Sequence, residues 1–242
     1  MQSLSGKVVV ITGASRGIGK GIAELFAGEN TRIVLVARKK TELQAVADSL
    51  GLPKKQVAIV TADISKASGM RKVAAAAYRR FGSLDIFINN AGVGFTGPIV
   101  DMDEKDFDRI VATNLKSVFL CFREVIPRMQ KQGGGQIINI SSMAGKQAVP
   151  NMAVYAASKA ALNVLSESVG GEVRNDNIRV CTVAPASTDT GFGSRGGPKR
   201  PAGNAATKLT VSEVAATVLH VAKQNPNAWV SYVDIRPLAK KG

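Results

Sequence analysis

Short apolar runs, many of them β-branched, alternate along the chain with longer stretches in which apolar residues recur every three or four positions. Most of the runs are apolar almost throughout, as is typical of parallel strands that are buried on both faces. We predict strands at residues 8–11, 33–36, 57–61, 86–88, 137–140, 178–183 and 229–235. The stretches between them predict helices, because their spacing places the apolar side chains on one helix face.

Alternating strands and helices predict an α/β fold: a Rossmann-type, doubly wound parallel sheet of about seven strands with helices on both faces. No linker or repeat divides residues 1–242, so we expect one domain. Residues 191–208 depart from this alternation because they are rich in glycine, proline and basic residues. Since they follow the end of a strand, where such sheets bind ligands, we expect either a mobile substrate loop or a disordered surface loop.

The composition is that of a globular protein, with 45% hydrophobic and 21% charged residues among 242. No apolar run reaches the roughly 20 residues that span a bilayer, and the first residues lack a secretory pattern, so we expect a cytoplasmic protein. Cys121 and Cys181 lie in apolar segments and are expected to be buried, reduced thiols. A single histidine argues against a structural metal site.

A net charge of +14 favours acidic partners such as phosphate-bearing ligands, anionic surfaces or nucleic acid. The basic residues are spread along the chain, without the aromatic-interleaved basic stripe that single-strand binders use. The sequence therefore favours a solvated basic surface and gives no support for a nucleic-acid partner.

A glycine-rich turn, TGASRGIG at residues 12–19, follows the first strand and opens a helix predicted over residues 18–27. Glycines permit a tight turn and close backbone approach, while free N–H groups and the positive helix end attract a pyrophosphate. The turn also fits the G-x-S-x-G nucleophile elbow of α/β-hydrolases, with Ser15 as nucleophile and His220 downstream. This alternative is disfavoured, since no earlier loop supplies an oxyanion hole and His220 lies off the apolar stripe of its helix.

The second strand indicates which dinucleotide binds. An NAD-specific site would place Asp or Glu after this strand, yet no acidic residue occurs between Asn30 and Thr41. The strand ends instead at Arg38 and Lys39, and Arg16 lies in the glycine-rich turn. Arginines beside the adenosine ribose suit a 2′-phosphate, so the sequence predicts NADP(H).

Tyr155 and Lys159 stand four residues apart in a helix predicted over residues 153–169, and therefore on one face. A buried lysine cation beside a phenol is expected to lower the tyrosine pKa from about 10, which suits proton exchange near neutral pH. Ser141 and Ser142 close a strand at the carboxyl edge, where a hydroxyl would orient a substrate oxygen or cap a helix.

Together these features resemble the short-chain dehydrogenase/reductase family over nearly the whole chain. Besides the glycine-rich turn, the motifs in family order and spacing are Asp63-Ile64, residues 89–92 (NNAG), Asn114, Ser142, residues 155–159 (YAASK) and residues 185–190. The resemblance implies that Tyr155 donates or accepts the proton, Ser142 polarises the substrate oxygen, Lys159 binds the nicotinamide ribose and tunes Tyr155, and Asn114 holds a relay water.

The resemblance also implies cofactor contacts. Asp63 would bind the adenine amino group, Ile64 would lie against the ring, Asn90 would contact the ribose through its backbone, and Thr188 and Thr190 would reach the carboxamide. The complete expected cofactor set is Gly13, Ser15, Arg16, Gly17, Ile18, Gly19, Arg38, Lys39, Asp63, Ile64, Asn90, Tyr155, Lys159, Thr188 and Thr190.

The implied function is hydride transfer between NADP(H) and a carbonyl or secondary alcohol, with Ser142 and Tyr155 contacting the substrate. A 3-oxoacyl thioester of acyl carrier protein or coenzyme A is the narrower alternative, and the charge of +14 favours it. Residues 232–238 differ from the ends of many such reductases, and Pro185-Ala186 differs from the Pro-Gly common in the family as a whole. A non-catalytic dinucleotide-binding regulator is disfavoured because all four catalytic positions are filled. The resemblance further suggests a homotetramer or homodimer.

Overall fold

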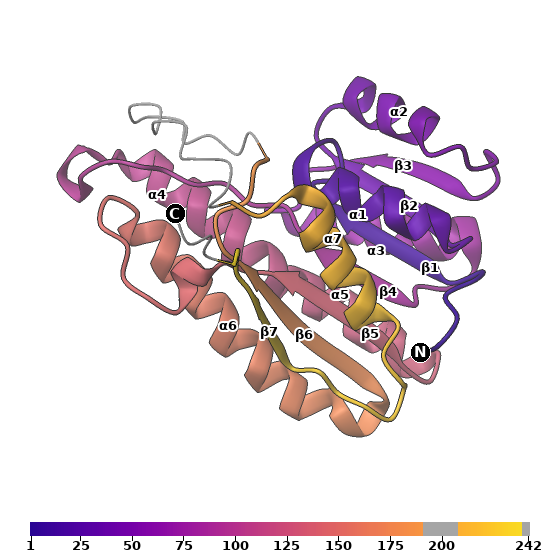
Figure 1. The fold of residues 1–242 in the computed structure, drawn as a ribbon. Helices are drawn as coiled ribbons and strands as arrows, with labels where there is room; N and C mark the ends of the chain where they lie inside the picture. The colour runs from indigo at the N-terminus through magenta and orange to yellow at the C-terminus, as the bar shows by residue number, and fades with distance from the viewer. Residues whose placement is uncertain (191–207, 239–242) are drawn as a thin grey trace.

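The computed structural model describes residues 1–190 and 208–238, and its centre is one parallel sheet of seven strands (Figure 1). The spatial order is β3-β2-β1-β4-β5-β6-β7. The strands are β1 (Val8–Thr12), β2 (Arg32–Ala37), β3 (Val57–Thr61), β4 (Ile86–Asn89), β5 (Gly135–Ile140), β6 (Ile178–Pro185) and β7 (Tyr232–Ile235). The chain proceeds outward from β1 to β3 and then in the opposite direction from β4, so the strand order reverses between β1 and β4. Open α/β sheets bind ligands at the carboxyl ends of the strands beside such a reversal.

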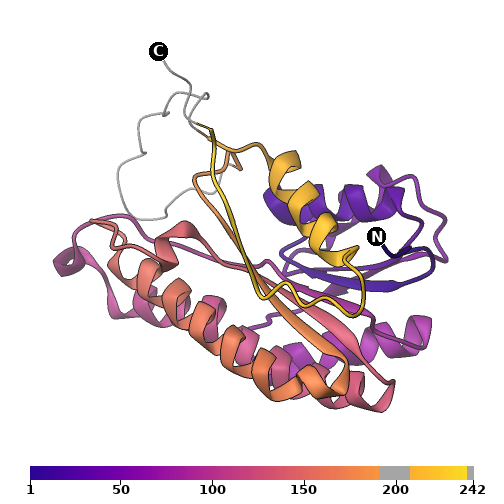
Figure 2. The same ribbon diagram turned by 60° about the horizontal axis from the view of Figure 1, so that its bottom comes forward.

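Helices cover both faces of the sheet. They are α1 (Gly17–Gly28), α2 (Lys40–Ser49), α3 (Ala67–Phe81), α4 (Glu104–Val111), α5 (Ser117–Lys131), α6 (Ala153–Val173) and α7 (Val211–Ala222). Helices α1, α2 and α7 pack on one face and α3, α5 and α6 on the other, and Figure 2 places α7 above the sheet and α6 below it. The doubly wound fold predicted from the sequence is confirmed.

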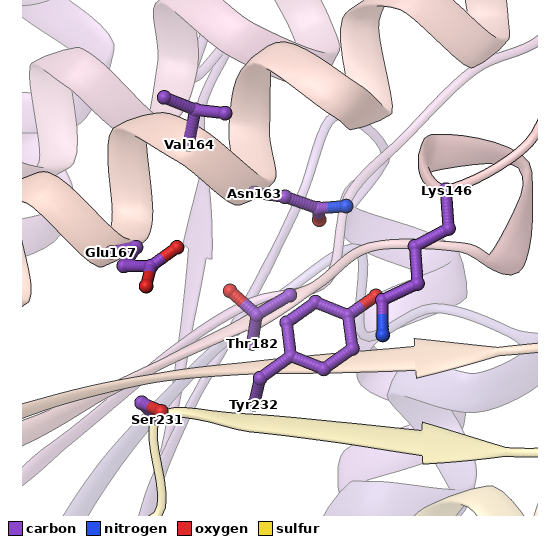
Figure 3. A pocket seen from close by; sticks show the side chains of 7 residues that line it. All are labelled: Lys146, Asn163, Val164, Glu167, Thr182, Ser231 and Tyr232. Atoms are coloured by element: carbon purple, nitrogen blue, oxygen red, sulfur yellow. The ribbon is translucent and has the colours of Figure 1, made fainter.

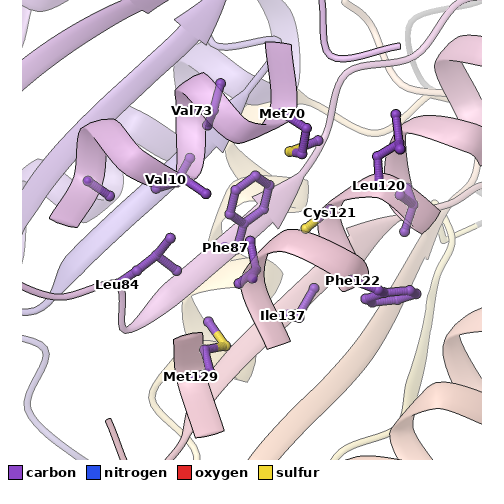
Figure 4. Close-up of a cluster of buried hydrophobic side chains, with 14 of the residues drawn as sticks. Val10, Met70, Val73, Leu84, Phe87, Leu120, Cys121, Phe122, Met129 and Ile137 are labelled. Atoms are coloured by element: carbon purple, nitrogen blue, oxygen red, sulfur yellow. The ribbon is translucent and has the colours of Figure 1, made fainter. Parts of the chain in front are cut away.

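The apolar runs are explained by two separate cores. Val8 and Val10 of β1 point into the core beneath α3 and α5, while Val9 and Ile11 point into the core beneath α1 and α7. Figure 4 shows the first core around the buried Phe87, with Met70 and Met129 on opposite sides of it. Because successive strand residues alternate between faces, a strand covered on both faces is apolar at most of its positions.

Of the two edge strands, β3 has the predicted bounds and β7 is shorter than predicted. Strand β7 begins at Tyr232 rather than at residue 229, because Trp229 is held by its side chain instead of by the sheet. Its indole N–H donates to the carbonyl of Val180 at 2.7 Å, and its ring packs against Gly170. Strand β3 is half-buried along most of its length, because it lies at the edge of the sheet and has only one neighbouring strand.

A π-helical turn separates α4 from α5. Apolar residues recur every three or four positions over residues 107–119, as in a continuous helix, but Ala112–Lys116 (η2) forms a wider turn with Asn114 at its centre. The loop expected at residues 191–208 lies, apart from Lys208, outside the described residues.

Candidate active site

The glycine-rich turn has a backbone that requires glycine. Gly13 and Gly17 have φ angles of 66° and 53°, in the left-handed region that side chains disfavour. A Cβ on Gly19 would lie 2.5 Å from Asn90 Nδ2 and closer still to the carbonyl oxygen of Gly13. The turn is therefore packed against the residues that follow β4, while Gly13, Ser15 and Gly17 remain partly accessible and Arg16 is exposed.

The amino end of α1 is suited to an anion. Its N-cap residue, Arg16, makes no side-chain cap hydrogen bond, and the first turn holds no acidic residue. The first N–H groups of a helix have no intrahelical partner, and they carry the positive end of the helix dipole. A 12-residue helix behind a glycine turn therefore fits the pyrophosphate of a dinucleotide.

Thr12 and Asn90 fix this turn to the sheet. The Thr12 hydroxyl accepts hydrogen bonds from the backbone N–H groups of Asn90 and Ala91, at 3.0 and 3.2 Å. The Asn90 side-chain amide donates to the carbonyl of Thr12 at 2.9 Å. The family resemblance implied only a backbone ribose contact for Asn90 and no role for Thr12. A hydroxyl residue at the end of an apolar strand was the feature of the sequence that could have indicated this role, and Thr12 is fully buried.

The predicted adenosine residues gather at the carboxyl ends of β2 and β3. The Asp63 carboxylate accepts the Ser65 hydroxyl at 2.6 Å and its N–H at 3.1 Å. These bonds, with the charges of Lys66 and Arg38, hold the pKa of Asp63 below its usual value. Ile64 is buried, and Lys39 pairs with Glu42 at 2.9 Å.

Ser142, Tyr155 and Lys159 converge beyond the end of β5. The Ser142 hydroxyl lies close enough to the Tyr155 hydroxyl to influence its pKa. The Lys159 ammonium is buried, donates to the carbonyl of Ile140 at 2.8 Å, and lies 5.9 Å from the centre of the Tyr155 ring. The sequence prediction that these three side chains share one place is therefore matched by the geometry.

The expected lowering of the Tyr155 pKa is wrong. Burial raises the pKa of Tyr155, and the nearby Ser142 hydroxyl opposes this only in part. Burial also lowers the pKa of Lys159 from 10.5 to about 8. The charged form of each group is penalised where water is excluded, and that effect exceeds the attraction that spacing alone had suggested.

Asn114 is held by both ends of its amide group. Its Oδ1 accepts the backbone N–H of Val93, and its Nδ2 donates to the carbonyl of Val93, each at 2.9 Å. Nδ2 also donates to the Ser158 hydroxyl at 3.1 Å, which ties the π-turn to α6. A Cβ on Gly92 would lie 3.4 Å from Asn114 Oδ1 and 3.7 Å from Lys159 Nζ, so glycine keeps the space between them clear.

The two adjacent serines have different environments. The Ser141 hydroxyl donates to Asn163 Oδ1 at 2.6 Å, and the Asn163 amide donates to the carbonyl of Gly145 at 3.2 Å. Ser141 therefore joins the serine turn to α6, whereas Ser142 faces Tyr155. Sequence reasoning missed Asn163, although it follows Lys159 by four residues and so continues the helix face of Tyr155 and Lys159.

The residues that follow β6 lie beside the glycine-rich turn. The Thr188 hydroxyl donates to the carbonyl of Ala186 at 2.9 Å, and a Cβ on Gly17 would lie 3.3 Å from the Thr190 Cβ. Thr190 therefore lies beside the glycine-rich turn.

A cavity of about 350 Å³ lies between α6 and the β6–β7 edge, and Figure 3 shows its lining. It includes Lys146, Asn163 and Tyr232 but none of Ser142, Tyr155 or Lys159. The hydrolase alternative has no support from the geometry: His220 is exposed on α7 and its ring nitrogen bonds to Gln224 at 2.7 Å.

Comparisons with known proteins agree with this arrangement. The family model described as short chain dehydrogenase matches residues 7–200. An uncharacterized oxidoreductase of Staphylococcus aureus is 30% identical over 238 residues, covering 98% of this chain and 100% of the relative. The chain belongs to the short-chain dehydrogenase family.

Solved structures of this family are also similar. A metagenomic short-chain oxidoreductase in complex with NADP is 35% identical, with a TM-score of 0.84 over 99% of this chain and 100% of that one. A 3-ketoacyl-(acyl-carrier-protein) reductase from Brucella melitensis, complexed with NADH, is 28% identical, with a TM-score of 0.85 over 96% and 98%. Family members of this shape therefore bind either dinucleotide.

Two further observations concern the chain as a whole. Among the described residues, no helix is both long and apolar enough to cross a membrane. Cys121 and Cys181 are free and buried, as predicted, and burial raises the pKa of each thiol to about 12.

Replacing Gly19 by alanine is expected to weaken dinucleotide binding at least tenfold and to destabilise the protein by about 1–3 kcal/mol, as overpacking does. The new methyl group would meet Gly13 O and Asn90 Nδ2. Gly28→Ala in the same helix is the control, because a Cβ there meets nothing within 4 Å. Equal cofactor affinities in the two variants, measured by calorimetric titration, would contradict the packed turn.

The buried Lys159 predicts a pH dependence of stability. Its pKa falls from 10.5 to about 8 on folding, so between these values the unfolded chain binds more protons and stability rises with pH. Relative to a Lys159→Met variant, the wild type should gain more than about 1 kcal/mol in free energy of unfolding from pH 7.5 to 10. Urea denaturation across this range measures it; a constant difference would show that Lys159 titrates normally.

Proposed function

We propose that the protein is an NADP(H)-dependent oxidoreductase that interconverts a carbonyl compound and the corresponding secondary alcohol. The observation that carries this proposal is the convergence of the Ser142 and Tyr155 hydroxyls beside the buried Lys159 ammonium, at the same edge of the sheet as the glycine-rich turn. Two hydroxyls and one cation around a single position suit an oxygen whose charge changes during the reaction.

The residues present fit a dinucleotide. The uncapped end of α1 offers N–H groups to the pyrophosphate, and the positive φ angles of Gly13 and Gly17 let the backbone approach it. Arg16, Arg38 and Lys39 supply positive charge for a 2′-phosphate, with Ser15 beside them. Ile64, Asp63 and Asn90 would contact adenine and ribose, and Thr188 and Thr190 would hold the nicotinamide carboxamide.

Each catalytic side chain has a distinct role in this proposal. When bound, the nicotinamide supplies or accepts the hydride at the carbonyl carbon. Ser142 donates a hydrogen bond to the substrate oxygen and fixes its position. Tyr155 donates its proton to that oxygen in the reductive direction, and its raised pKa keeps it protonated at neutral pH.

Lys159 and Asn114 would return the proton from solvent. The clear space beside Gly92, between Asn114 Oδ1 and Lys159 Nζ, has the polar neighbours that an ordered water needs. Lys159, with a pKa of about 8, can gain and lose a proton near neutral pH. Its bond to the carbonyl of Ile140 holds the ammonium beneath the cofactor position.

A 3-oxoacyl thioester is the narrower candidate substrate. The net charge of +14 favours an acidic carrier, and the similar reductase from Brucella melitensis acts by its name on a 3-ketoacyl group. A homodimer or homotetramer and a cytoplasmic location remain expectations of the family resemblance.

The test is NADPH oxidation, followed at 340 nm, with a panel of ketones and 3-oxoacyl thioesters. Tyr155→Phe should lower kcat by about 10²–10⁴, because general acid catalysis is lost, while the Kd for NADPH stays within about threefold. Tyr78→Phe is the matched control, since that hydroxyl bonds to Gln132 far from Ser142.

Full turnover by Tyr155→Phe would refute the proton-donor assignment. The proposed function would be refuted if the wild type neither bound NADPH nor oxidised it with any carbonyl compound in the panel.

A further inference from the structure

An acidic side chain lies among the residues assigned to the 2′-phosphate. Glu42, in the first turn of α2, places its Oε1 2.9 Å from Lys39 Nζ. The hydroxyl of Ser15, in the glycine-rich turn, also lies close to this carboxylate. These two contacts, with the charges of Lys39 and Arg16, lower the pKa of Glu42. Glu42 is therefore an anion between the end of β2 and the turn before α1.

The partners of Glu42 are those that a ribose phosphate would use. An ammonium and a hydroxyl donate to a carboxylate oxygen in the same way as to a phosphate oxygen. Lys39 and Ser15 both belong to the set expected to bind NADP(H), and Arg16 contributes to the same electrostatic field. A carboxylate and a phosphate cannot both take these donors without bringing two anions together.

Stabilisation of α2 alone does not account for this arrangement. An acidic residue in the first turn interacts favourably with the helix dipole, and its pairing with Lys39 three residues earlier is an ordinary surface contact. The contact with Ser15 is different, because it joins α2 to a loop 27 positions earlier in the chain. Glu42 thus lies between two segments whose residues are assigned to the adenosine ribose and its 2′-phosphate.

We propose that Glu42 competes with the 2′-phosphate for Lys39 and Ser15, and thereby limits the preference of the protein for NADP(H) over NAD(H). This inference rests on the proposed dinucleotide site. NADP(H) must displace the Glu42 carboxylate from its donors and bind beside a like charge. NAD(H) carries a hydroxyl at the same position, and a hydroxyl can donate to the carboxylate instead of being repelled.

The test is a Glu42→Gln variant, which removes the charge and keeps the length and hydrogen-bonding capacity of the side chain. Dissociation constants for NADPH, NADH and adenosine 2′,5′-bisphosphate are measured by calorimetry at low salt. Asp48→Asn is the matched control: it also neutralises an acid on α2, but six residues further along, where Asp48 bonds to Gln44. Thermal unfolding verifies that both variants fold.

Glu42→Gln should tighten NADPH and the bisphosphate about threefold to fivefold, the effect of one charge removed at a partly exposed site. NADH should bind equally or more weakly, Asp48→Asn should change neither cofactor, and 0.5 M salt should shrink the gain. An unchanged or weakened NADPH affinity in Glu42→Gln would overturn the inference.

The two proposals fail in different ways. A wild type that binds NADPH no more tightly than NADH contradicts the proposed NADP(H) preference. The role of Glu42 is decided separately, by the ratio of NADPH affinities between variant and wild type, whatever the preference of the wild type.

Discussion

The buried ammonium of Lys159 is the constraint around which the carboxyl end of the sheet is organised. A cation removed from water is costly unless polar groups surround it, and here the carbonyl of Ile140 accepts a hydrogen bond from the ammonium. This carbonyl is the last of β5, and the next two residues are the serines of the site. Strand β5 therefore both accepts the hydrogen bond from Lys159 and places Ser142 beside Tyr155.

The surrounding contacts keep that geometry from relaxing. Ser141 and Asn163 join the serine turn to α6, and a Cβ at Gly145 would lie 2.8 Å from both Asn163 Nδ2 and the backbone carbon of Lys159. On the other side, Asn114 connects Val93 to Ser158 across the π-turn. A wider helical turn is common at functional sites, and here it brings an amide group toward α6 without breaking the long α4–α5 path.

The fold was largely predictable from the sequence, because strands covered on both faces leave uninterrupted apolar runs. The predicted start of β7 was wrong because Trp229 is held by its side chain and not by backbone pairing. The π-turn was not predicted because five residues are too few to distinguish it from an α-helix. Spacing brought Tyr155 and Lys159 together but could not give their burial, which reversed the expected shift of the Tyr155 pKa. No acidic residue lies between Asn30 and Thr41, but the next residue, Glu42, is in the first turn of α2, which brings its carboxylate close to Ser15.

The central claim is that this edge of the sheet supports hydride transfer from the nicotinamide to a carbonyl carbon. The most direct measurement uses NADPH deuterated at the transferable C4 position, a ketone that the protein reduces, and mass spectrometry of the alcohol. The account predicts one deuterium per product molecule, bonded to the carbinol carbon. An alcohol without deuterium at carbon would contradict the account, because the hydrogen would then have come from solvent.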